Sequence, residues 1–469
     1  MGKHTELIDG GLRSLVGTRK FYKKVLLVAV PIMIQNGITN FVSLLDNIMV
    51  GQVGTEQMSG VAIANQLVFI FNLCIFGAVA GAGILSAQFY GSGNAEGVRD
   101  TFRFKLLFGV ILSAIFAVIF LTVGEPLIQQ FIHQGEGIGD LEATRSYGKA
   151  YLEVIVIGIL PFALTQCYSG TLRETGETVI PMIGGIIAVC VNLVFNYILI
   201  FGKLGAPELG CVGAAIATVL SRFVELAIVA GWTHKHVARN PFIRGALRSF
   251  KIPRSLLKQI IAIGLPLFIN ELMWSFGITF MTQCYSVRGL EVVAAFNIAN
   301  TISNVFNVVF LSLGNAVGII IGQMLGAGRL EEAKREDKQL IAFSVFCCFL
   351  TGAMLILLSP LFPRMYNTEE IVKELATQLI FITGCCQPLY GFVHGTYFTL
   401  RAGGKSVVTF LFDSTYMWVI PIPIVFALTR FTAIPVQLVY LFAELSNIIK
   451  CIVGYVLVKR GVWIKNIVD

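Results

Sequence analysis

The sequence predicts an all-α polytopic membrane protein whose twelve transmembrane helices form two six-helix lobes. Three observations predict this fold class: the composition, the length of the apolar segments, and an internal repeat. Of 469 residues, 56% are hydrophobic and 13% are charged, and the mean hydropathy is +0.78. The charged share is about half that of soluble domains. The composition therefore excludes an ordinary soluble domain.

Long apolar segments follow one another along the chain. A helix of about 20 apolar residues spans the ~30 Å hydrocarbon layer of a bilayer. The expected spans are residues 25–50, 58–88, 104–123, 148–172, 179–201, 212–232, 257–284, 293–325, 339–361, 374–400, 406–429 and 434–458. Pro31 lies inside the first span and predicts a kink, because proline lacks the N–H that an unbroken helix needs.

Charge predicts the sidedness of these spans. The connections after even-numbered spans are rich in lysine and arginine, above all the stretch from Lys235 to Lys258, and the connections after odd-numbered spans carry few. Basic loops stay on the cytoplasmic side of a membrane. We therefore expect both termini, residues 1–24 and 459–469, to be cytoplasmic in a protein of the cell membrane.

The second half of the chain repeats the first, and Pro31 aligns with Pro266 at a spacing of 235 residues (266 − 31). Polar and glycine matches at this spacing are Asn65/Asn300, Asn72/Asn307, Gln88/Gln323, Gly54/Gly289, Gly91/Gly326 and Gly93/Gly328; Arg173/Arg401 and Gly176/Gly404 match at 228 residues (401 − 173). Six spans per copy is an even number, so both copies enter the membrane from the same side and form a parallel repeat. We expect lobes at 25–232 and 257–458, joined by a basic cytoplasmic linker at 233–256.

Charge and motifs argue against several function classes. The net charge of +8 comes from basic residues at the ends of the spans, not from one basic stripe with aromatics, so we expect no nucleic-acid partner. The hydrolase motifs HExxH and GxSxG do not occur in the sequence, which argues against an enzyme and an organic cofactor. The ten cysteines contain no CxxC pair, so we expect them to be reduced.

Six motifs occur in order along the chain: LLDNIMVG, GTEQMSGVAIANQ, LRETGETVIPM, NLVFNYILIFG, GAAIATVLSR and GLPLFINELMWS. Together with the repeat, they resemble the multidrug and toxic compound extrusion (MATE) family over nearly the whole chain. The resemblance implies an antiporter that exports amphipathic, often cationic, organic compounds by alternating access in exchange for inward Na⁺ or H⁺. It implies small organic substrates and a lipid bilayer as partners, and we expect the chain to function as a monomer.

The resemblance also implies a cation site in the first lobe, able to hold Na⁺, at Asp46, Asn192, Asn196 and Thr218. Asp46 is the strongest candidate, because an acid in a spanning helix costs on the order of 2.5–3.5 kcal/mol and usually has a function. The alternative for Asp46 is an acid at the outer interface. At Asn196 the family often has a second acid, and the amide here lowers the charge available to hold Na⁺. The alternative for both asparagines, which lie one turn apart, is a structural bridge between helices.

The second lobe offers two further candidates for cation coupling, Glu271 and Asp413. Trp274 lies one turn after Glu271 and could hold an organic cation against its ring. His394 is of the residue type that titrates near neutral pH and could relay protons. For Glu271 and His394 the alternative is a structural contact between helices, and for Asp413 it is an acid at the interface near the cytoplasm. The candidates for the substrate cavity are Asn36, Asn40, Trp274, Tyr416 and His394.

A flippase for a lipid or lipid-linked saccharide is the nearest alternative function. It would recognise phosphate with several cations in its cavity, whereas basic residues within the spans are few, chiefly Arg222 and Lys450. We expect Arg222 to pair with Glu225, three residues away on the same helix face, and Lys450 to belong to a structural or gating ion pair. These expectations favour a cationic cargo.

Overall fold

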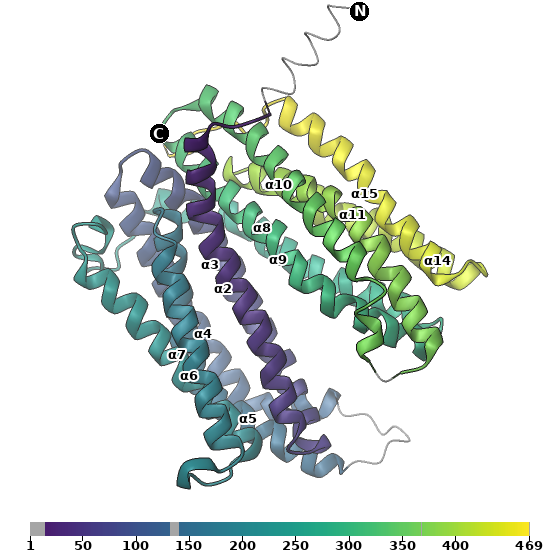
Figure 1. Cartoon of the computed structure of the whole chain (residues 1–469). Coiled ribbons are helices and arrows are strands. Elements are labelled where there is room, and N and C mark those ends of the chain that lie inside the picture. Colours follow the sequence, from purple (N-terminus) through teal and green to yellow (C-terminus); the bar gives the residue numbers. More distant parts are fainter. Residues whose placement is uncertain (1–14, 132–139, 367, 469) are drawn as a thin grey trace, which may run out of the picture. The chain divides into compact units, whose positions relative to one another are not determined.

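The computed structural model describes residues 15–131, 140–366 and 368–468, in which all regular structure is helical. The first long helices are α2 (Arg19–Gly51), α3 (Thr55–Gly91), α4 (Ala95–Phe131), α5 (Leu141–Glu174), α6 (Val179–Ile200) and α7 (Gly210–Lys235) (Figure 1). The remaining ones are α8 (Arg254–Ser286), α9 (Leu290–Gly326), α10 (Leu330–Leu358), α11 (Glu370–Ala402), the interrupted segment Ser406–Phe431 and α15 (Val436–Lys459). Short 3₁₀ turns lie at η1 (Lys203–Gly205), η2 (Pro241–Ile243), η3 (Ala246–Arg248) and η4 (Pro363–Met365).

The predicted fold class is confirmed, because each expected span falls on one of these helical segments. Eleven of them, counted within the described residues, are long and apolar enough to cross a membrane, and α11, with 33 residues, is the other long helix. The helices run past the apolar spans: α4 has 37 residues where 104–123 was expected. A helix satisfies its own backbone hydrogen bonds at any polarity, so it continues beyond the apolar residues that mark a span. Pro31 lies inside α2 and does not end it.

Contacts between helices divide the chain into two compact units. The described residues of unit 1 are 15–33, 87–93, 262–366 and 368–468, and those of unit 2 are 34–86, 94–131 and 140–261. Residues 15–33 belong to unit 1 because they pack on α10: the ring of Tyr22 lies 5.2 Å from that of Phe343, and Lys24 pairs with Glu336 at 3.2 Å. The lobe and linker boundaries expected from the sequence stay a prediction, and most of the expected segment 1–24 lies outside the described residues.

Each unit has its own apolar core, in which small residues let helices come close. In unit 2, Phe71 and Leu152 are almost completely buried. In unit 1, a side chain at Gly352 on α10 would collide with the carbonyl group of Gly384 on α11. Dispersion between closely packed helices, rather than water exclusion, holds such bundles together in lipid.

The internal repeat is visible in the backbone. The matched glycines that adopt positive φ angles, a conformation that other residues rarely adopt, are Gly54 and Gly289 (144° and 127°), Gly93 and Gly328 (76° and 71°), and Gly176 and Gly404 (88° and 70°). A second sign lies within unit 1, where a Cβ at Gly91 would collide with the carbonyl of Gln323 and a Cβ at Gly326 with the carbonyl of Gln88. The two copies of the motif therefore meet reciprocally.

The segment after α15 packs back into unit 1. Trp463 is 1% exposed. The side-chain amide of Gln88 donates to the carbonyls of Ala402 (2.9 Å) and Lys465 (3.3 Å), and its Oε1 accepts from the backbone N–H of Ile467 (2.9 Å). One glutamine thus joins the end of α3, the end of α11 and the C-terminal segment.

The segment Ser406–Phe431 consists of α12 (Ser406–Phe410), a π-helical turn η5 (Leu411–Thr415), α13 (Tyr416–Val419) and α14 (Pro421–Phe431). The helix is interrupted before Pro421, as a residue without an N–H requires. Asp413 lies in the π-helical turn, a rare element that often marks functional sites.

Candidate functional site

In unit 2 the fold brings Asp46, Asn192, Asn196 and Thr218 together from α2, α6 and α7. Asn196 Nδ2 donates to Asp46 Oδ1 at 2.6 Å, and the side-chain amide of Asn192 contacts Asn196 Nδ2 and Thr218 Oγ1, each at 3.3 Å. The side chains of Asn192 and Asn196 lie next to each other because residues four apart share a helix face. That these side chains hold a cation stays a prediction.

The side-chain amide of Asn192 lies against the carboxylate of Asp46. Its Nδ2 donates to Asp46 Oδ1 at 3.0 Å and to Oδ2 at 3.2 Å, the orientation in which the amide donates to the carboxylate. Asn196 is 1% exposed, and its Oδ1 has no hydrogen-bond partner. Carboxylate, amide and hydroxyl oxygens suit a hard cation, so the donor set is chemically able to hold Na⁺.

A cavity of about 310 Å³ opens beside Asp46 within unit 2. Its lining includes Asp46, Asn65, Asn72, Tyr151, Phe162 and Arg222. Arg222 pairs with Glu225 at 3.4 Å, as expected, and its guanidinium lies 4.9 Å from the ring centre of Phe162. None of the ion pairs among the described residues includes Asp46, so neutral amides hold this carboxylate.

Two asparagines of this lining, Asn65 and Asn72, were not predicted as site residues. Both match an asparagine in the second half of the sequence, a signal that could have identified them. Tyr151 donates to Asn65 Oδ1 at 3.3 Å. The predicted cavity residues Asn36 and Asn40 are not part of this lining: Asn36 is half-buried and Asn40 is exposed. Their role in a substrate cavity stays a prediction.

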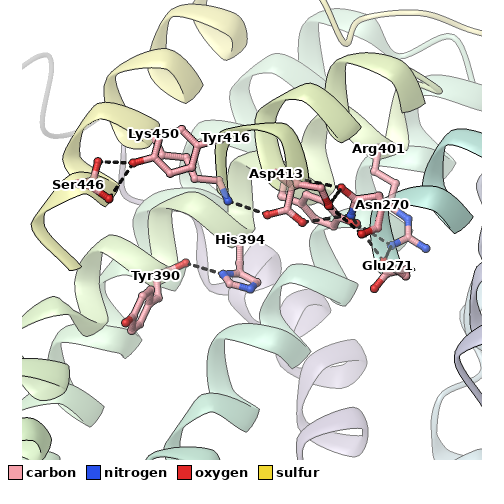
Figure 2. Close-up of polar contacts among 11 residues, drawn as sticks. Asn270, Glu271, Tyr390, His394, Arg401, Asp413, Tyr416, Ser446 and Lys450 are labelled. Carbon is pink, nitrogen blue, oxygen red and sulfur yellow. Dashed lines mark hydrogen bonds and ion pairs between the residues drawn. The ribbon is translucent and has the colours of Figure 1, made fainter. Parts of the chain in front are cut away.

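In unit 1 the predicted acids Glu271 and Asp413 each lie beside a basic residue. Figure 2 shows Arg401 of α11 beside Glu271 of α8, with Nη1 and Oε1 3.9 Å apart. Asp413 Oδ1 accepts from Lys450 Nζ of α15 at 2.6 Å. Lys450 thus belongs to an ion pair, as expected. Because the two opposite charges in each acid–base pair lie this close, neither pair carries a net charge.

Asn270 connects the two pairs into one network. Its Nδ2 donates to Asp413 Oδ2 at 3.1 Å (Figure 2). The same Nδ2 donates to the hydroxyl of Tyr397 at 3.3 Å, and that hydroxyl donates to Glu271 Oε1 at 3.3 Å. Ser414, in the π-helical turn, donates to Asn270 Oδ1 at 2.7 Å. The sequence analysis singled out neither Asn270 nor Arg401, although Arg401 matches Arg173 in the repeat.

The other predicted residues of unit 1 are Tyr416, His394 and Trp274. Their contacts among the described residues do not form a cation site with this network. The Tyr416 hydroxyl donates to the carbonyl of Ser446 at 2.5 Å, and Lys450 Nζ lies 5.5 Å from the Tyr416 ring. His394 contacts the carbonyl of Tyr390 at 3.2 Å and the ring of Phe310 at 4.3 Å. Trp274 is 44% exposed. Substrate contacts of these residues stay predictions.

The comparisons with known proteins agree with the architecture and the repeat. The family model MatE matches residues 31–198 and 266–427, one block in each half of the chain. A "Probable multidrug resistance protein NorM" of Thermotoga maritima is 26% identical over 412 residues, which are 87% of this chain and 86% of that protein. A "Multidrug resistance protein MdtK" of Edwardsiella ictaluri is 26% identical over 370 residues, 78% of each chain.

Solved structures share the fold. An outward-facing multidrug resistance MATE family transporter of the MOP superfamily has a TM-score of 0.85 at 21% identity, covering 96% of this chain and 98% of that chain. A MOP superfamily transporter from Pyrococcus furiosus, whose binding pocket of reverse polarity suggests a different function, has a TM-score of 0.84 at 21% identity with the same coverage. The family match covers well over half of the sequence, so this multi-pass membrane protein belongs to the MatE family of transporters.

Proposed function

We propose that this chain is a secondary active exporter that expels amphipathic organic cations in exchange for Na⁺ or H⁺. The observation that carries the proposal is Asp46, an acid held by amides that lines a cavity. The similar proteins named as multidrug resistance proteins support the export of several drugs.

Exchange requires that the driving cation and the cargo exclude each other. Asp46 supplies a negative charge that a proton or Na⁺ can neutralise. Two unit charges 4 Å apart attract by about 4 kcal/mol at an effective dielectric constant of about 20. Neutralising Asp46 therefore removes an attraction of this size for a cationic cargo, which is enough to couple the two binding events.

The donor set supports either driving ion. A proton needs only Asp46, whereas Na⁺ would draw oxygens from Asn192, Asn196 and Thr218 as well. The Oδ1 of Asn196, which has no hydrogen-bond partner, supports Na⁺. The lining also includes Phe71, Ile155 and Ile159. These apolar side chains beside Asp46 support an amphipathic cargo, since pockets for organic ligands combine apolar side chains with a few placed polar groups.

The proposed cycle alternates the access of Asp46 between the two sides of the cell membrane. With the site open outward, a cation binds and cargo leaves; with the site open inward, the cation leaves and cargo binds. A parallel repeat supports such a cycle, because its halves can rock against each other. In this proposal both termini and the linker 233–256 are cytoplasmic, and one chain suffices.

Buried basic residues favour the alternative of a flippase for a phosphate-bearing lipid or lipid-linked saccharide. Lys105, Arg401 and Lys450 are 1%, 8% and 8% exposed. Each has an acidic partner, however: Glu174, Glu271 and Asp413 respectively. Basic groups already compensated in this way support phosphate binding less well than Asp46 supports a cation.

The test is the efflux of a fluorescent organic cation from proteoliposomes under an imposed Na⁺ gradient or an imposed pH gradient. The native chain is compared with Asp46→Asn and with Glu153→Gln, which removes an exposed acid of the same unit. We expect one gradient to drive efflux, Asp46→Asn to abolish it and Glu153→Gln to leave it unchanged. If neither gradient moves the dye while a labelled lipid-linked saccharide crosses, the chain is a flippase.

A further inference from the structure

A buried carboxyl group near the start of α10 belongs to neither site described above. Asp337 is 0% exposed. Thr399 Oγ1 of α11 lies 2.5 Å from Asp337 Oδ1, and Asp337 Oδ2 has no hydrogen-bond partner. An ionised carboxylate in this position would lose its hydration and keep a single hydrogen bond, which is unfavourable.

Counting protons shows under which condition Asp337 is the donor. The Thr399 hydroxyl has one proton, and its Oγ1 also lies 3.0 Å from the carbonyl oxygen of Gly395. Threonine commonly donates to the carbonyl four residues earlier in a helix. When it does so here, the 2.5 Å contact is a hydrogen bond only if Asp337 is the donor. A neutral carboxyl group with its proton on Oδ1 satisfies both contacts.

The surroundings offer an ionised Asp337 little compensation. The titratable groups on the helices packed around it include Tyr22 and Lys24 on α2, Lys334, Arg335, Glu336 and Lys338 on α10, and His394, Tyr397 and Arg401 on α11; α9 has no Asp, Glu, Lys, Arg or His between Val292 and Gly326. Arg335 is exposed, and Lys334 pairs with Glu331 at 2.5 Å. Lys338 is exposed, Lys24 pairs with Glu336 at 3.2 Å, and Arg401 pairs with Glu271 at 3.9 Å. Asp337 itself takes part in none of the ion pairs of the described residues.

The repeat supplies an internal comparison. The matching threonine of unit 2, Thr171 (399 − 171 = 228), accepts from the buried Lys105 at 3.1 Å. Lys105 also pairs with Glu174. The residue that matches Glu174 in unit 1 is Ala402 (402 − 174 = 228). A buried charge beside this threonine therefore has a counter-ion in unit 2, whereas the matching position beside Asp337 offers none.

We propose that Asp337 is a proton-binding site of unit 1, neutral in the packed arrangement of α10 and α11 described here. Its ionisation moves the proton from Oδ1 to water and leaves a carboxylate whose two oxygens need donors. The close packing of α10 on α11 excludes them, so the helices must move apart before the proton leaves. Proton binding and helix packing are thus linked, and each changes the equilibrium of the other.

This inference depends neither on the cargo nor on Asp46, and its test needs no transport. Infrared spectra of the full chain in liposomes are compared for the native protein, Asp337→Asn and Thr399→Val, with Glu331→Gln as control. Glu331 lies on the same helix with its carboxylate 86% exposed. At neutral pH we expect a protonated-carboxyl band that Asp337→Asn removes, that Thr399→Val shifts to higher frequency, and that Glu331→Gln leaves in place.

Identical bands in the native chain and Asp337→Asn would overturn the proposal, because Asp337 would then be ionised. If Asp337→Asn does not fold, Thr399→Val decides, and an unshifted band rejects the site. Thermal unfolding gives a second readout. The folded chain holds a proton that the unfolded chain releases, so the melting temperature of the native protein should fall between about pH 5 and pH 8, and that of Asp337→Asn should fall less. Equal pH dependence in the two chains would also reject the site.

Discussion

Asp46 in unit 2 and Asp413 in unit 1 are both acids on helical segments that the sequence predicts to span the membrane, but their partners differ. Asp46 accepts from an asparagine amide at 2.6 Å and lines a cavity of about 310 Å³. Asp413 accepts from the Lys450 ammonium group at 2.6 Å. A carboxylate paired with an ammonium group is already compensated, whereas one held by amides still carries an uncompensated charge. We therefore expect external cations to bind in unit 2, and the ion pair of unit 1 to hold its helices together.

The largest expected effect comes from breaking the pair of unit 1. Lys450→Met leaves Asp413 buried without its counter-ion, which should destabilise the protein by about 3–5 kcal/mol. The double variant Asp413→Asn/Lys450→Met should regain most of that loss, because no lone charge remains. Chemical unfolding in detergent measures both. A loss below about 1 kcal/mol for Lys450→Met would contradict a structural role for the pair.

The next effect concerns the acid of unit 2. Asp46→Asn should lower gradient-driven efflux about 100-fold, the loss expected when a charge-assisted interaction of about 2–3 kcal/mol disappears. Its thermal stability should stay close to that of the native chain, since the amide keeps a similar shape. Efflux assays and melting curves on the same preparation separate the two. Efflux at the native rate would remove Asp46 from the coupling site.

A second acid beside Asp46 should increase the difference in cation binding between unit 2 and unit 1. Asn196→Asp adds a carboxylate beside Asp46 and should tighten Na⁺ binding about five- to tenfold, since a further charge gains about 1–1.4 kcal/mol. The Na⁺ concentration needed for half of the thermal stabilisation measures this affinity. A matched change outside the site, Glu153→Gln, should leave it unaltered. An unchanged Na⁺ dependence in Asn196→Asp would place the ion elsewhere.

The smallest effect is expected at Thr218, the hydroxyl-bearing residue of the predicted cation site. Thr218→Val removes one hydroxyl oxygen and keeps the size of the side chain, so Na⁺ affinity should fall about fivefold, equivalent to about 1 kcal/mol. The same titration measures it. If Thr218→Val is as damaging as Asp46→Asn, the hydroxyl does more than donate one oxygen.

The fold could be predicted because its signals are local. Apolar runs mark the spans, and Pro421 marks the interruption before α14. The π-helical turn Leu411–Thr415 has no such signal, because Ser414 bonds to Asn270, 144 residues away in sequence. A tertiary contact of this kind leaves no pattern in its neighbourhood.

The candidate sites of units 1 and 2 also differ in how far the sequence could predict them. The Asp46 set could be located from the family resemblance and from the one-turn spacing of Asn192 and Asn196. The partners of the unit 1 acids could not, since Asp413 and Lys450 lie 37 residues apart on different helices. The sequence near Asp337 does not predict a buried acid either, because Asp337 lies in the charged run EEAKREDK. The packing of α10 on α11, which the local sequence does not reveal, separates it from water.

The three hydrogen bonds of Gln88 have a practical consequence for protein engineering. The C-terminal segment carrying Trp463, Lys465 and Ile467 is part of the packed structure of unit 1. Removing it would strip Gln88 of partners and open the space filled by an indole ring, much as a core mutation would. A purification tag or fluorescent reporter therefore belongs after Val468, with a flexible spacer, and a chain shortened to the end of α15 should yield less folded protein.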